Sequence, residues 1–144
     1  MSHYSEVKIE FRDRVALVAA LERLGFKGKV EFHQEAKALY GYQGDRREQQ
    51  AHIIIRRQHV GQAANDLGFQ RQSDGTYRAW ISEYDQNHNG YNDSWMGRLK
   101  QAYGVERAKA LHGGDLECCL NQLLQVGIQT EIKIMGAVGP GERN

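Results

Sequence analysis

The stretch HVGQAANDLGFQRQSDGTYRAWISEYD, residues 59–85, decides how the rest of the chain can fold. It reads as a β-hairpin with strands at 66–72 and 76–84, and Gly75 supplies the positive φ that a tight connection requires. Side chains of the second strand alternate between two faces. One face carries Tyr77, Ala79 and Ile81, and the other carries Arg78, Trp80 and Ser82. We expect the other elements to form layers against this ribbon.

The segments before the hairpin predict a β–α–β unit. Apolar residues that alternate with charged ones indicate a half-buried strand, namely Val7, Ile9 and Phe11. Asp13 is placed to cap the following helix, and Gly25 is placed to end it in the left-handed conformation. A short strand is expected at 29–32. We therefore predict that the sheet begins with two strands joined by a helix.

Between this unit and the hairpin lies the most strand-like run of the chain, AHIIIRR, residues 51–57. Its three isoleucines cover both faces, which is typical of a strand at the centre of a sheet. Residues 45–48, DRRE, read instead as a solvated turn. The run 51–57 is therefore expected to pair beside the hairpin.

The segments after the hairpin complete an α+β fold. A helix capped by Asp93 or Ser94, a helix opened by Asp115 and a last strand at 128–134 are expected. We predict a mixed, mostly antiparallel sheet with helices on one face, in a ferredoxin-like βαββαβ layout with an added β-hairpin. Residues 1–135 are expected to form a single domain, and 136–144 a flexible tail.

Composition indicates an ordinary globular protein of the cytoplasm. The chain has 144 residues, 40% of them hydrophobic, and a net charge of +1 that gives no general attraction to nucleic acid or to membranes. It has no apolar run of the roughly 20 residues that a membrane span needs and no signal-peptide pattern at its start. Its two cysteines, Cys118 and Cys119, are adjacent, which indicates reduced thiols.

Three blocks of the sequence together resemble a known family. They are the opening MSHYSEVK, the block that runs from GYQGDRR through AHIIIRRQHVGQAANDLGFQRQSDGTYRAWISEYD, and the later RLKQAYG. They are similar to the domain of unknown function 1257 family, over roughly residues 1–112. The resemblance supplies no activity that can be carried over residue by residue. Members of the family occur near AAA+ ATPases, which implies an accessory role and an AAA+ ATPase as a partner.

One candidate metal site is a calcium-type loop at residues 85–93, DQNHNGYND. Its oxygen ligands would be Asp85, Asn87, Asn89 and Asp93, with a glycine at the sixth position. The twelfth position is Met96 where such a loop needs a bidentate Glu. We favour the alternative, an Asn/Gly-rich connector that caps the next helix, and predict no metal site.

Catalytic and cofactor motifs are not evident in the sequence. The six histidines lack the close pairs typical of zinc sites. No nucleophile elbow and no glycine-rich phosphate loop occurs. We therefore expect no cofactor and favour a protein that is not an enzyme.

A basic and aromatic set is the best candidate for recognition. If the strand at 51–57 pairs near the hairpin, Arg56, Arg71, Arg78 and Trp80 could share one exposed sheet face, with Arg57 beside them. His3 in the polar N-terminus is a further candidate contact. We expect a non-catalytic accessory or adaptor protein that docks a protein partner on this face. The alternative is an RNA-binding module in which arginines contact phosphates and Trp80 stacks on a base.

Overall fold

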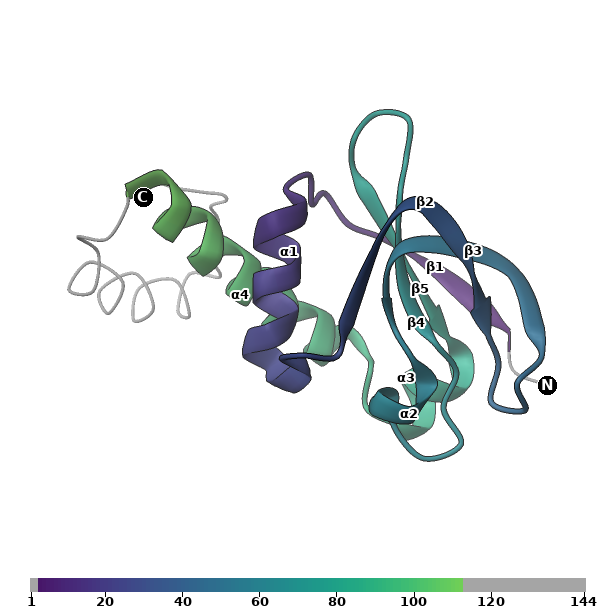
Figure 1. The fold of residues 1–144 in the computed structure, drawn as a ribbon. Helices are drawn as coiled ribbons and strands as arrows, with labels where there is room; N and C mark the ends of the chain where they lie inside the picture. Colours follow the sequence, from purple (N-terminus) through teal and green to yellow (C-terminus); the bar gives the residue numbers. More distant parts are fainter. Residues whose placement is uncertain (1–2, 113–144) are drawn as a thin grey trace. The chain divides into compact units, whose positions relative to one another are not determined.

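The computed structural model describes residues 3–112, drawn in colour in Figure 1. The described chain divides into two compact units, one of residues 3–12 and 25–96 and the other of residues 13–24 and 97–112. The elements, in order, are β1 Tyr4–Lys8, α1 Arg14–Leu21, a π-helical turn Glu22–Phe26, β2 Val30–Tyr40, β3 Arg46–Ile55, α2 Arg57–Val60, β4 Leu67–Arg71, β5 Tyr77–Ser82, α3 Glu83–His88 and α4 Asp93–His112.

The first unit contains a five-stranded sheet in the order β1-β5-β4-β3-β2, and every neighbouring pair of strands is antiparallel. The predicted α+β class is confirmed. The strand order differs from a ferredoxin-like layout because β2 to β5 form a meander of successive neighbours, which leaves β1 and β2 at opposite edges. The predicted domain end at 135, the tail and the elements from Asp115 onward lie outside the described residues.

The hairpin predicted from residues 59–85 is confirmed as β4 and β5 (Figure 1). Gly75 has a φ of 90°, and the Asp74 side chain accepts a hydrogen bond from the backbone N–H of Thr76 at 2.9 Å. β3 pairs with both β2 and β4, so the isoleucine-rich run is central in the sheet, as its two apolar faces predict.

Three local predictions need correction. β1 ends at Lys8, because the strand does not extend as far as Ile9 and Phe11, although both of these are buried. Residues 45–48 are not a solvated turn, because β3 begins at Arg46 and the side chain of Arg47 is only 12% exposed. The polar connector after the hairpin begins as helix α3, which Ser82 caps by accepting a bond from the N–H of Asp85. The connector caps the next helix as expected, but through the side chain of Asn92, which accepts a bond from the N–H of Trp95, and not through Asp93 or Ser94.

The two faces of the sheet carry separate apolar layers. Leu67 and Phe69 of β4 and Ile53 and Ile55 of β3 are buried and share one face, since Ile53 pairs with Phe69 and Ile55 with Leu67. On the other face, a smaller buried cluster is partly covered by two aromatic rings. Its members are Leu39, Ala51 and Ile54, with Tyr4 and Trp80 packed against them.

Gly68 allows this smaller cluster to form. It is paired with Ile54 on one side and Trp80 on the other. A Cβ added at Gly68 would lie 2.6 Å from the Cβ of Ala51 and 2.9 Å from a methyl group of Leu39. The glycine therefore makes room for the end of β2 to close over the sheet.

The second unit, described by itself, is built on α1 and α4. The Asp13 carboxylate caps α1 by accepting a bond from the N–H of Ala16, as predicted. The hydroxyl of Tyr103 in turn accepts a bond from the N–H of Asp13. Within residues 3–112, no helix has both the length and the apolar character needed to cross a membrane.

We predict that Gly68→Ala destabilises the protein by about 1–3 kcal/mol, because the new methyl group meets buried side chains of β2 and β3 with no room to move. The free energy of unfolding from urea titration measures the loss. Gly97→Ala in α4 is the matched control, since a Cβ there meets nothing within 4 Å and alanine favours a helix. A Gly68→Ala protein as stable as the wild type would contradict the close packing.

Candidate functional site

One sheet face gathers the aromatic and charged side chains that the hairpin sequence pointed to. Trp80 and Arg78 of β5 lie opposite Glu6 and Lys8 of β1, and Gln70 of β4 lies opposite Arg78. Directly opposed residues of paired strands point to the same face. We call the surface formed by Glu6, Lys8, Gln70, Arg78 and Trp80 the Trp80 face.

Arg78 and Trp80 are held together as a pair on this face. The guanidinium carbon of Arg78 lies 5.5 Å from the centroid of the Trp80 ring, within the range of a cation–π contact. The same guanidinium donates to the side-chain oxygen of Gln72 at 3.0 Å and lies 3.4 Å from the Glu6 carboxylate. The indole N–H of Trp80 donates to the side chain of Gln70 at 2.9 Å.

The side chains of Arg78 and Trp80 are therefore held in fixed orientations by contacts within the chain itself. Trp80 packs partly against the small apolar cluster, while Arg78 remains about a third exposed. A half-buried tryptophan in contact with an arginine is typical of hot spots, the few residues that contribute most of the binding energy at protein interfaces.

The other predicted residues are not all brought to this face. Arg71 pairs with Tyr77, so its side chain belongs to the opposite face from Arg78. Arg57 opens α2, and its guanidinium donates to the backbone carbonyl of Tyr42 at 3.2 Å. His3 is exposed, and its carbonyl accepts a bond from the N–H of Glu83. The expected single arginine face is thus divided.

Arg56 forms ion pairs with two carboxylates of the same chain. It donates to Glu31 at 3.0 Å and to Asp66 at 2.8 Å. Burial favours the neutral form of Glu31, but hydrogen bonds from Arg56 and His33 outweigh burial and hold the pKa of Glu31 below its ordinary value. The positive charge of Arg56 is therefore largely neutralised by carboxylates of the same chain.

Asp66 is a buried residue that the sequence did not single out. One carboxylate oxygen accepts from the N–H of Tyr40 and from Arg56, and the other accepts from the N–H of Arg57, each at 2.8 Å. Its backbone carbonyl accepts from the Tyr4 hydroxyl at 2.6 Å. One feature of the sequence could have identified Asp66 as a buried polar residue: the polar pair Asn65-Asp66 interrupts an apolar run just before β4.

The carboxylate of Asp85, the first residue of the calcium-loop candidate, is buried and accepts hydrogen bonds from neighbouring segments. It is 1% exposed, and its carboxylate accepts from Asn65, from Ser82 at 2.8 Å and from Asn89 at 2.8 Å. The exposed Asp93 opens α4, and Asn87 is exposed on α3. Residues 85–88 of the calcium-loop candidate therefore lie in helix α3, and residues 89–92 connect α3 to α4. Within residues 3–112, the structure contains no cluster of three or more candidate metal ligands.

Two largely buried tyrosines lie near these acidic groups, and their hydroxyls donate to backbone carbonyls, Tyr91 to Val60 and Tyr4 to Asp66. Burial, reinforced by the charge of Asp85, raises the pKa of Tyr91 to about 12. Burial, followed by the charge of Asp66, raises the pKa of Tyr4 well above its ordinary value. Both phenols therefore remain neutral donors at physiological pH.

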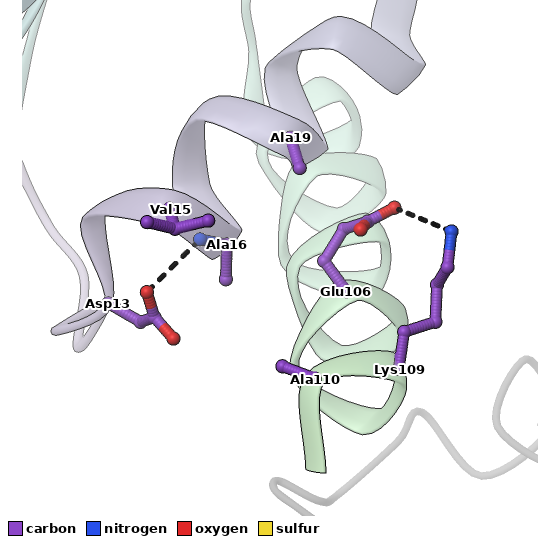
Figure 2. Close-up of a pocket in the computed structure, with 7 residues that line it drawn as sticks. All are labelled: Asp13, Val15, Ala16, Ala19, Glu106, Lys109 and Ala110. Atoms are coloured by element: carbon purple, nitrogen blue, oxygen red, sulfur yellow. Dashed lines mark hydrogen bonds and ion pairs between the residues drawn. The ribbon is translucent and has the colours of Figure 1, made fainter. Parts of the chain in front are cut away.

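A pocket of about 260 Å³ lies within the second unit, between α1 and the last turns of α4 (Figure 2). Val15, Ala16, Ala19 and Ala110 supply its apolar lining, and Asp13, Glu106 and Lys109 supply its polar groups. These charges already face opposite charges, because Asp13 lies 3.7 Å from Arg107 and Glu106 lies 3.9 Å from Lys109. The pocket offers a small apolar surface and no converging set of reactive groups.

We predict that Asp66→Asn lowers the free energy of unfolding by about 3–5 kcal/mol, because an amide cannot accept from all three donors and leaves Arg56 without its closest carboxylate. Urea denaturation measures the effect. Asp93→Asn, the same change at an exposed position, is expected to cost less than about 1 kcal/mol. Equal losses for the two variants would refute the role of Asp66.

Comparison with known proteins gives one match. A family model described as "Protein of unknown function (DUF1257)" matches residues 20–112, which is more than half of the chain. Neither the curated proteins nor the solved structures contain a protein that matches the chain. The resemblance inferred from the sequence is therefore confirmed, and the chain belongs to the DUF1257 family.

Proposed function

We propose that the protein is a non-catalytic accessory or adaptor protein that binds a protein partner through the Trp80 face, as a component of a larger assembly. The observation that carries this proposal is the Arg78–Trp80 pair. Its two side chains are stacked and fixed by Gln72, Glu6 and Gln70, yet both remain partly exposed. Such preorganised side chains lose little conformational freedom on binding.

The distribution of charge supports a protein partner over RNA. Arg56 is paired with two carboxylates, and Arg78 lies beside Glu6. Arg71 belongs to the opposite face of the sheet. A surface that binds phosphates needs several unneutralised cations on one side. Because the arginines are divided between the two faces and partly paired with carboxylates, neither face has as many such cations as a single arginine face would have.

The buried acids support an adaptor over an enzyme. Asp66 and Asp85 are each satisfied by three or more donors from the protein's own backbone and side chains. The hydrogen bonds that these two carboxylates accept join separate segments of the chain. Because members of this family are expected near AAA+ ATPases, such an ATPase is the first partner to test.

We predict that Trp80→Ala reduces capture of the partner at least tenfold, since truncating an interface hot spot costs about 2 kcal/mol or more. The tagged chain is used for pull-down from its native host after nuclease treatment, with captured AAA+ ATPase quantified by mass spectrometry. Arg78→Ala is expected to weaken capture as well, because it removes the cation stacked on the ring.

Arg71→Ala is the matched control, because it removes an exposed arginine from the other face of the same hairpin. Thermal melts verify that each variant is folded. Undiminished capture by folded Trp80→Ala protein would reject the Trp80 face as the docking surface. Binding of an RNA oligomer with a steep salt dependence would favour the nucleic-acid alternative instead.

A further inference from the structure

The structure of residues 3–112 places no strand beside the outer edge of β1, where a row of backbone hydrogen-bonding groups faces outward. Within residues 3–112, β1 pairs only with β5. The N–H of Glu83 donates to the carbonyl of His3 at 2.7 Å, which continues the register that pairs Tyr4 with Ser82. Backbone groups alternate along an antiparallel strand. Those of Ser5 and Val7 therefore face β5, and those of Tyr4, Glu6 and Lys8 face outward.

The opposite edge of the sheet is less suited to pairing. β2 shows register shifts between Phe32 and Lys37 and again between Ala38 and Tyr40. Bulges of this kind twist an edge strand and interrupt its row of donors and acceptors, which is one way in which proteins protect a sheet edge. β1 has a continuous register from Tyr4 to Lys8.

The side chains of β1 are complementary to a second copy of the same strand. Glu6 and Lys8 carry opposite charges, are both exposed and lie on the same face of the sheet. If two β1 strands pair antiparallel about a twofold axis at Val7, Glu6 of each copy lies opposite Lys8 of the other. The outward-facing residues then form the hydrogen-bonded pairs, as the alternation requires.

This register is preferred over its neighbour. An axis at Glu6 would place two glutamates directly opposite each other, which is destabilising, whereas the axis at Val7 gives two attractive cross-strand pairs. We propose that the protein forms a twofold-symmetric dimer through the β1 edge, with Glu6 paired to Lys8 in both directions. The twofold axis runs through the sheet, so the Trp80 faces of both copies lie on one side of a continuous ten-stranded sheet.

This inference does not depend on the proposed function, and its test contains no partner protein. Sedimentation velocity of the full chain over a range of concentrations is expected to show a monomer–dimer equilibrium. Lys8→Glu places like charges opposite each other twice and is expected to weaken the dimer at least about tenfold. Adding Glu6→Lys to Lys8→Glu reverses both charges and is expected to restore it.

Lys37→Glu makes the same charge reversal on β2, the other edge strand, and is expected to leave the dimer unchanged. A chain that stays monomeric at all concentrations, a dimer indifferent to Lys8→Glu, or a dimer weakened equally by Lys37→Glu would overturn the proposal. Amide exchange adds a test that needs no variant. Slow exchange at Glu6 and Lys8 in the dilute monomer would show that the chain covers its own edge, which also contradicts the proposal.

Discussion

The carboxylate of Asp66 is the interaction on which the sheet unit depends. It lies just before β4 and binds the last residue of β2 through the N–H of Tyr40, and the segment after β3 through Arg56 and Arg57. The Tyr4 hydroxyl of β1 reaches its carbonyl. One buried residue thereby joins segments from four strands. An anion buried this deeply is tolerated because it accepts charge-assisted and backbone hydrogen bonds, which replace the water it has lost.

The arrangement of the Trp80 face, the proposed docking surface, follows from these contacts of Asp66. With Tyr40 held beside Asp66, the end of β2 brings Leu39 over Gly68, where the missing side chain leaves room for it. Leu39 and its neighbours then support one side of Trp80, and Arg78 stacks against the ring. The exposed pair is thus oriented by buried polar and apolar contacts, which is what distinguishes a preorganised binding surface from a mobile one.

The charged residues of the sheet unit fall into two groups with different roles. The side chains of Asp66, Asp85 and Arg56 form hydrogen bonds within the protein, and these bonds hold segments in place. Glu6 and Lys8 on β1 belong to the Trp80 face and are exposed to solvent, and Glu6 also lies 3.4 Å from Arg78 of the same face. A chain of near-zero net charge can therefore still present a specific pattern of charge, because specificity comes from local arrangement and not from the total.

The sequence by itself determined the features that rest on local periodicity and backbone chemistry. These are the hairpin with Gly75, the central isoleucine strand, the Asp13 cap, the separation of Arg78 and Trp80 from Tyr77 and Ala79, and the family. Only the tertiary structure decided the strand order, the placement of Arg71 apart from Arg78, and the roles of Asp66 and Asp85. The reason is physical. Alternation and capping act between residues a few positions apart. The hydrogen bonds from Arg56 and Tyr4 to Asp66, and from Asn65 to Asp85, join residues 10 to 62 positions apart, whose meeting no local pattern encodes.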